Sequence, residues 1–468
     1  MNSSNVEHFE YSLKEKRIAL LVSSLGSFLN PFMGSSINIA LPSIGIAFSM
    51  DNILLNWVSS IFLLSSAIFL VPFGKIADIH GRKKIFKWGI LGYMVSSLIC
   101  AISTSSLMLI IIRFIQGLFI SMVTATSIAI ITSIFKKNER GKAIGINIAA
   151  VYIGLTLGPP IGGILVQNLG WQWIFLINVL ISGCAFIFTI ISLKGEWAEA
   201  KNEKLDIIGS ILYGGFLLSL MIGMSQLRSF LGFVFLIFSI IGIIIFIYWE
   251  QKVKNPVLNI SLFKDNKVFA FSNLAALINY MSTFAIGFLL SLYLQYILNL
   301  TPQEAGFILL TQPIVQATLS PLAGRLSDKK EPQIIASIGM GLLSLGLIML
   351  IFTDELTPLS YIISCQLILG LGYALFSSPN TNAVMGSIDK RYFGIASATL
   401  STMRLIGQTL SMQIVLLIFT LIIGPTEITP IYYGLFNLSM KIALLTFAIF
   451  SVFGIFASLA RGKGKKIE

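Results

Sequence analysis

Two short segments, far apart in the sequence, place a carboxylate and basic side chains at corresponding points of an otherwise apolar chain. The first runs from Gly74 to Asp78 and the second from Gly324 to Asp328. Each follows a long apolar run and opens a basic stretch. A carboxylate at such a point can accept hydrogen bonds from a helix N-terminus or from an arginine fork. A charged cluster repeated in two halves of a hydrophobic chain indicates a duplicated membrane transporter.

The residues around the two copies would allow a close, charged contact between helices. Gly81 and Arg82 complete the first copy, and Arg325 stands in the second. Gly74 would let two helices approach closely, and Asp78 suits the N-terminus of a helix. A plain basic loop that only sets membrane orientation is the alternative, and it accounts for the neighbouring lysines better than for the spacing of glycine, aspartate and arginine.

A second motif spaces small residues along one apolar run. Its members are Gly154, Gly158, Pro159, Gly162 and Gly163. Small residues four apart allow close helix packing, and proline removes backbone hydrogen bonds and bends a helix. Ordinary glycine and proline packing, common in membranes, is the competing interpretation.

Two arginines lie inside apolar runs, where a charge is costly and marks a functional candidate. Arg113 is followed by Gln116, and Arg404 lies deeper in its run. For Arg113 the alternative is a side chain that extends to the outer headgroups. For Arg404 it is a structural role, bonding to backbone carbonyls.

Composition indicates that lipid is the solvent. The chain has 468 residues, of which 56% are hydrophobic and only 11% charged, against about 25% charged in a soluble domain. The net charge of +12 does not indicate nucleic-acid binding, because the lysines fall between apolar runs. The three cysteines lie in apolar runs and predict buried small side chains, and two histidines predict no metal site.

The apolar runs predict an all-α polytopic membrane protein with fourteen spans of about 20 residues or more. Their approximate bounds are 18–42, 54–76, 85–103, 107–134, 143–166, 172–193, 207–226, 230–249, 268–298, 304–326, 333–352, 358–385, 393–424 and 433–460. Alternate loops and the two tails hold 28 of the 32 basic residues, so both termini are predicted to be cytoplasmic in a cell membrane.

The repeat divides these spans into six, two and six, with pseudo-twofold related halves. We expect a cytoplasmic tail over 1–17, a six-helix bundle over 18–193, two inserted helices with their linkers over 194–267, a second six-helix bundle over 268–460 and a tail over 461–468.

These motifs resemble the fourteen-span drug:proton antiporter family of the major facilitator superfamily, and the resemblance covers essentially the whole chain. It implies the major facilitator fold, a gating role for the segment around Asp78, and export for the motif that starts at Gly154. It also implies alternating access with proton antiport, and a role for Arg113 in proton transfer or substrate binding.

One position departs from the family. Met33 stands nine residues before Pro42, where the family often has an aspartate, and no Asp or Glu lies in the interior of a predicted span. A cation in a low-dielectric site needs a fixed counter-charge. The sequence therefore favours neutral, zwitterionic or anionic amphiphiles over lipophilic dications, and it offers no obvious carboxylate for proton coupling.

If the halves follow the superfamily, spans 1, 4, 9 and 12 line the substrate cavity. Their candidate lining residues include Asn30, Asn38, Gln116, Asn279, Tyr280, Gln366 and Asn380. For each one, hydrogen bonding between helices is the plainer alternative.

The sequence thus predicts a monomeric secondary transporter, in the lipid bilayer, that exports small amphiphilic or drug-like compounds against a proton or another coupling ion. An exporter of an endogenous anionic metabolite or a lipid-linked molecule is the first alternative, and a non-transporting membrane sensor is the second. We expect no enzyme activity, cofactor, metal or nucleic-acid partner, because no phosphate loop or nucleophile–base pair occurs.

Overall fold

The computed structural model describes residues 12–135, 139–193, 195–198, 200, 203–254, 256–258, 263–264, 266–388 and 393–462, without the side chains of 140–142, 328 and 393–395. These residues form helices and loops, with no strand among them. Fourteen helical segments in this part of the chain are long and apolar enough to cross a membrane. The predicted all-α architecture and number of spans are therefore confirmed.

The first eight spans are single helices. They are α1 (Leu13–Phe48), α2 (Asn52–His80), α3 (Arg82–Ala101), α4 (Ser106–Ile134), α5 (Arg140–Leu169), α6 (Gln172–Ser192), α7 (Ile207–Ser225) and α8 (Phe230–Glu250). Polar residues cap the N-termini of several of these helices. At α2 the Asp51 side chain accepts the Leu54 N–H at 2.7 Å, and at α4 the Ser105 side chain accepts the Met108 N–H at 3.2 Å.

The ninth and tenth spans, predicted as continuous, are each built from shorter pieces. The ninth contains α10 (Lys267–Thr283), α11 (Ile286–Leu292) and a π-helical turn (Tyr293–Ile297), and the tenth contains α12 (Pro302–Leu309) and α13 (Thr311–Lys329). At the first break the Ser411 hydroxyl accepts the Ala285 N–H at 3.0 Å, so a neighbouring helix supplies the partner that the helix itself lacks.

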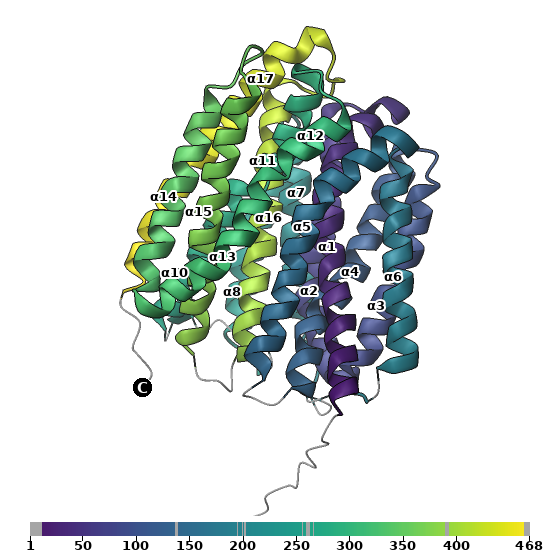
Figure 1. Ribbon diagram of the computed structural model, residues 1–468, viewed down its shortest axis with the longest axis vertical. Helices are drawn as coiled ribbons and strands as arrows, with labels where there is room; N and C mark the ends of the chain where they lie inside the picture. The colour runs from purple at the N-terminus through teal and green to yellow at the C-terminus, as the bar shows by residue number, and fades with distance from the viewer. Residues whose placement is uncertain are drawn as a thin grey trace, which may run out of the picture.

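The last four spans are α14 (Pro332–Ile351), α15 (Leu359–Gly386), α16 (Phe393–Ile422) and α17 (Tyr433–Ala460), the last preceded by a 3-10 turn (Pro430–Tyr432). The described chain begins and ends at the same end of the bundle, called here the terminal end, and the opposite end is called the far end (Figure 1).

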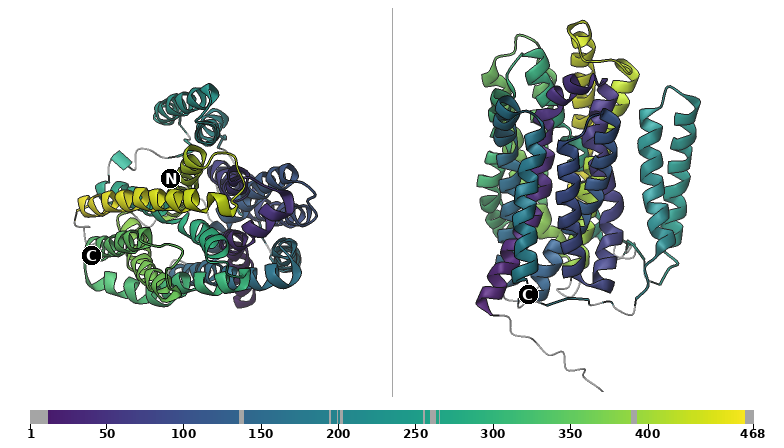
Figure 2. Two further views of the ribbon diagram at one scale, coloured as in Figure 1. Left: turned by 90° about the horizontal axis from the view of Figure 1, so that it is seen from above. Right: turned by 90° about the vertical axis from the view of Figure 1, so that its right-hand side faces the viewer.

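The helices pack as two groups with a hairpin beside them. Helices α1 to α6 contact one another, and α10 to α17 do the same. Helices α7 and α8 pair with each other and stand to one side, and α7 contacts α2 and α16 (Figure 2). The two groups meet where α5 packs on α12 and α13, and where α2 packs on α16. This interface positions the residues of the candidate site.

Candidate functional site

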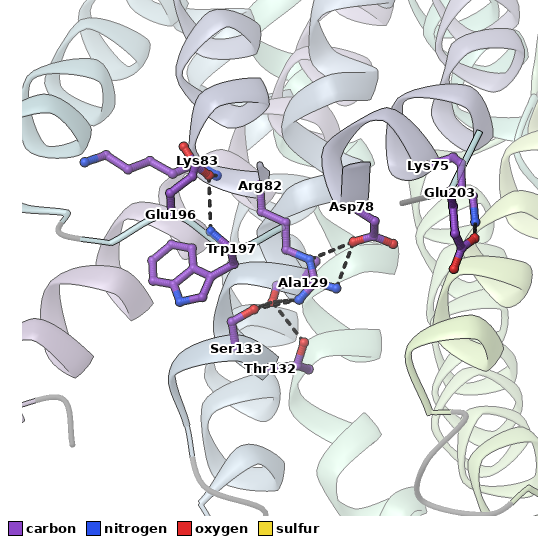
Figure 3. A network of polar contacts seen from close by, with 10 residues as sticks. All are labelled: Lys75, Asp78, Arg82, Lys83, Ala129, Thr132, Ser133, Glu196, Trp197 and Glu203. Carbon is purple, nitrogen blue, oxygen red and sulfur yellow. Dashed lines mark hydrogen bonds and ion pairs between the residues drawn. The ribbon is translucent and has the colours of Figure 1, made fainter. Parts of the chain in front are cut away.

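The gating segment forms an ion pair at the terminal end of α2 and α3. Asp78 Oδ1 accepts hydrogen bonds from Arg82 Nε and Nη2, both at 2.8 Å. Arg82 Nη1 also donates to Ser133 Oγ at 2.6 Å and to the Ala129 carbonyl at 3.3 Å, so the fork ties α2 and α3 to the end of α4 (Figure 3). A planar guanidinium suits this because it can serve several acceptors at once.

The helix N-terminus beside this pair is capped by a residue that the sequence analysis did not single out. Glu196 accepts the Lys83 N–H at 2.9 Å and the Lys84 N–H at 3.1 Å, at the start of α3 (Figure 3). Gly81 makes this possible, because its φ is +112° and a Cβ there would collide with the Glu196 carboxylate. The helix-capping carboxylate is thus Glu196, on the linker after α6, and Asp78 pairs with arginine instead.

The second copy of the gating segment has different surroundings. Gly324 packs beside Ser378, where an added Cβ would lie 2.7 Å from the hydroxyl, and the Arg325 side chain is exposed. The Asp328 side chain and those at the start of α16 lie outside the described residues. A contact of Asp78 with the start of α16, which a gate between the two groups of helices would require, therefore stays a prediction.

The small residues of α5 face two different partners. Gly154 and Gly162 pack on α1, where an added Cβ would lie 2.8 Å from the Phe28 carbonyl and 2.9 Å from Ser36 Cβ, respectively. Gly158 meets α1 in the same way, at Ser35. The helix continues through Pro159 and Pro160.

One residue of the motif faces the opposite group of helices. An added Cβ at Gly163 would lie 2.9 Å from Gln303 Cα on α12, and Gly306 of α12 in turn lies against the Pro159 carbonyl. The backbones of α5 and α12 are therefore in direct contact, and the two glycines set how closely the two groups approach at the far end.

Arg113 is fully buried, with 0% of its surface exposed, so it does not extend to the headgroups. Its Nε donates to the Val58 carbonyl at 3.0 Å and its Nη1 to Gln116 Oε1 at 2.7 Å, and the guanidinium lies 4.2 Å from the centre of the Phe62 ring. Its Nη2 has no hydrogen-bond partner. A buried cation with a free donor can bind an anionic group or a water molecule.

Met33 lies inside the first group of helices. Its side chain is 0% exposed, and its sulfur lies 3.8 Å from Asn178 Nδ2 on α6. Asn178 in turn accepts the Tyr93 hydroxyl at 3.0 Å. The position that departs from the family thus belongs to an internal polar chain in this conformation.

Arg404 lies at the interface of the two groups, well inside α16. Its Nη2 donates to Thr381 Oγ1 at 2.9 Å, its guanidinium lies 5.6 Å from the centre of the Tyr280 ring, and its Nε has no partner. Across the interface, Tyr152 Oη and Ser377 Oγ are 3.0 Å apart. The Tyr152 phenol is also close enough to Tyr280 and Arg404 to interact electrostatically. The structure thus brings together a cation, hydroxyls and aromatic faces from α5, α10, α15 and α16, which we call the Arg404 cluster.

The remaining candidates divide between buried contacts and the interface. Asn279 is buried with neither amide atom bonded, Gln366 is buried, and Asn30 is half-buried. Asn38 accepts a hydrogen bond from Ser59 at 3.4 Å through its side chain and from Ser291 at 2.7 Å through its carbonyl.

Asn380 takes the structural role that the sequence analysis kept as the alternative. It donates to the Ser272 carbonyl at 3.1 Å and accepts from Arg461 at 3.0 Å, so it helps to join α10, α15 and the end of α17. Burial lowers the pKa of the Arg461 guanidinium to about 10, which leaves it charged at neutral pH.

At the far end, hydrogen bonds join the two groups of helices at residues that the sequence did not single out. Asn52, 1% exposed, donates its backbone N–H to the Thr426 carbonyl at 3.0 Å and its side-chain amide to the Gly424 carbonyl at 2.7 Å. Arg228, at the tip of the α7–α8 hairpin, donates to the Leu421 carbonyl at the end of α16 at 2.6 Å. In the sequence, an asparagine at the start of a helix predicts only a helix cap. The contact of Asn52 with the opposite half is therefore visible only in the fold.

An all-helical bundle of two groups, with buried cations and a polar cluster between them, defines a membrane transporter. The chain belongs to the Major Facilitator Superfamily, whose profile matches residues 23–411. It is 31% identical to the riboflavin transporter RibZ of Clostridioides difficile over 84% of this chain and 86% of that protein. It is 28% identical to the multidrug resistance protein Stp of Mycobacterium tuberculosis, over 85% of this chain and 74% of that one.

Solved structures agree on the fold. A bacterial homologue of the human lysosomal transporter Spinster, in an inward-facing and unoccupied conformation, superposes with a TM-score of 0.69 at 16% identity, covering 96% of this chain and 98% of that one. The family and the structural neighbours are transporters, not enzymes.

Proposed function

We propose that the protein exports small amphiphilic compounds, neutral or anionic, by alternating access, and that the Arg404 cluster binds them. The observation that carries this proposal is the partnerless Nε of Arg404, well inside α16 and beside Tyr280. A fixed positive charge next to an aromatic face favours a ligand with an anionic or acceptor group and an apolar ring. The same charge disfavours lipophilic dications.

The proposed cycle uses the two ends of the bundle as gates. The far-end gate consists of Asn52 with the Gly424–Thr426 loop, and of Gly163 against α12. The terminal-end gate would include Asp78 and Arg82. The excess of basic residues at the terminal end supports a cytoplasmic location of both termini. The far end, closed here, would then face outward and open to release the substrate.

We propose proton antiport as the coupling, on the strength of the α5 motif. Since no Asp or Glu lies in the interior of a span, the proton would bind away from mid-span or to the substrate itself. The protein is proposed to act as a monomer, because each gate is made within one chain.

A second candidate is the export of an endogenous aromatic metabolite. Its support is the relative named a riboflavin transporter together with the tyrosines near Arg404, since Tyr373 also lies close to Tyr280. Flat tyrosine faces suit a planar ring.

The test is transport into inside-out vesicles under a pH gradient, with matched dyes that differ in charge and with riboflavin. Arg404→Gln should reduce transport of anionic dyes by about tenfold or more, a loss of about 1.4 kcal/mol in binding, and neutral dyes less. Arg404→Lys should retain most anion transport, and Arg17→Gln, which removes an exposed charge at the terminal end of α1, should leave it unchanged. The proposal would be contradicted if the wild type exported dications efficiently and Arg404→Gln left that rate unchanged.

A further inference from the structure

The α7–α8 hairpin is closed at its terminal end by two carboxylates. Asp206, at the start of α7, accepts the Gly209 N–H at 2.9 Å through Oδ1. Trp249 Nε1, one residue before the end of α8, lies 3.1 Å and 3.0 Å from the two Asp206 oxygens and donates to both. This carboxylate is therefore held firmly in place.

Glu250, the last residue of α8, is buried, with only 4% of its surface exposed. Its Oε2 accepts the Leu258 N–H at 2.7 Å, while its Oε1 has no hydrogen-bond partner. A buried carboxylate oxygen without a donor is costly if the group is ionised.

The unpartnered oxygen and an Asp206 oxygen both lie close to Gly209. A Cβ added at Gly209 would lie 2.6 Å from Glu250 Oε1 and would also collide with Asp206 Oδ2, so the two carboxylates approach over this glycine.

The nearby cations are engaged elsewhere or exposed. On α2, Lys75 pairs with Glu203, Asp78 with Arg82, and His80 Nδ1 lies 3.3 Å from the Ile76 carbonyl. After α8, Lys252 bonds to the Tyr248 hydroxyl. Lys204 and Lys254 are exposed, and the only cation in the described side chains of α16 is Arg404, whose guanidinium bonds to Thr381.

We propose that Asp206 and Glu250 bind one proton between Asp206 Oδ2 and Glu250 Oε1. Two adjacent carboxylates cannot both ionise cheaply, and a shared proton converts their repulsion into a hydrogen bond. The proton comes from water at the terminal end, and its release leaves a charge of minus two on the pair. A metal ion would require about six oxygen ligands, whereas the described residues place two carboxylates here.

The bound proton tethers the linker that leads from the hairpin to α10. Glu250 holds Leu258, and the Leu258 side chain packs into the cluster that joins α2, α7 and α16, which includes Leu64, Tyr213 and Leu405. At lower pH the proton is bound and the linker is docked. As the pH rises the proton leaves, the carboxylates repel each other, and the hold on Leu258 weakens.

The test is infrared difference spectroscopy of the full-length protein in lipid nanodiscs, titrated between about pH 5 and about pH 9. The wild type should show the C=O stretch of one protonated carboxyl group that disappears at high pH. Glu250→Gln and Asp206→Asn should each remove this band. Glu203→Gln, a carboxylate on the same linker that pairs with Lys75, is the matched control and should retain it.

Hydrogen exchange of the Leu258 amide, corrected for its intrinsic rate, gives a second readout. In the wild type its protection should fall as the band disappears, and in Glu250→Gln it should be independent of pH. Absence of a titrating band from the wild type, or its survival in Glu250→Gln, would overturn the proposal. Loss of the band on adding sodium at constant pH would overturn it in favour of a cation site.

Discussion

At the scale of single residues, the proposed terminal-end gate contains two carboxylates that bind different donors. Asp78 neutralises Arg82, and Arg82 reaches the end of α4, while Glu196 caps α3. Because Arg82 is only 8% exposed, removing its partner leaves a nearly buried charge with weaker compensation.

We expect Asp78→Asn to fold but to transport poorly. The amide keeps one hydrogen bond to Arg82 and loses the charge, which weakens the terminal-end closure by about 1 kcal/mol, since Asp78 itself is part exposed. Transport rate and cysteine accessibility at the terminal end are the measurements. Glu203→Gln, which removes the surface pair with Lys75, is the control. If Asp78→Asn transports like the wild type and its cysteine accessibility is unchanged, Asp78 is not part of a gate.

At the scale of elements, α5 packs on two different helices through its small residues. Gly154, Gly158 and Gly162 fit α1 within one group, and Gly163 fits α12 of the other. The same small-residue motif therefore contacts both groups, and in the proposed cycle the contact with α12 separates when the far end opens.

Gly163→Ala should hinder closure of the far end. Its Cβ would press on the backbone of Gln303, and such overpacking costs about 1–3 kcal/mol. The population open at the far end should rise, measured by labelling of a cysteine at Gln167. Gly145→Ala on the same helix, with no atom near the added Cβ, is the control. Equal labelling of both variants would show that Gly163 does not limit closure.

At the scale of the whole molecule, hydrogen bonds between the two groups gather at the far end. Besides those of Asn52, Ser291 donates to the Asn38 carbonyl at 2.7 Å and Gln295 to the Ile39 carbonyl at 3.1 Å. In the proposed cycle these bonds break when the far end opens, so we expect them to influence the balance between the two conformations.

Asn52→Ala should shift this balance toward the far-end-open state. It removes the side-chain bonds to the Gly424 and Thr426 carbonyls, each with a net contribution of about 1 kcal/mol, so the ratio of the two populations should change by about 30-fold. Distances between spin labels on the two groups at the far end would measure it. Asn168→Ala, which loses only a bond within its own helix, should leave these distances unchanged.

The sequence by itself determined the solvent, the spans and the family. Long apolar runs can satisfy their backbone in lipid only as helices, so span positions follow from hydropathy alone. The repeat of Gly74–Asp78 at Gly324–Asp328 and the glycines from Gly154 onward are local patterns, and they carried the resemblance that the family match confirmed.

The tertiary structure alone decided which residues meet. Met33 and Arg404 both lie in apolar runs, yet Met33 packs inside one group and Arg404 lies between the groups, because helix rotation is set by packing against neighbours. Glu196, Asn52 and Glu250 gained their roles from partners far away in sequence. The break at Phe284 and Ala285 likewise depends on Ser411 of a distant helix, because a freed backbone group in lipid must find its partner in another part of the fold.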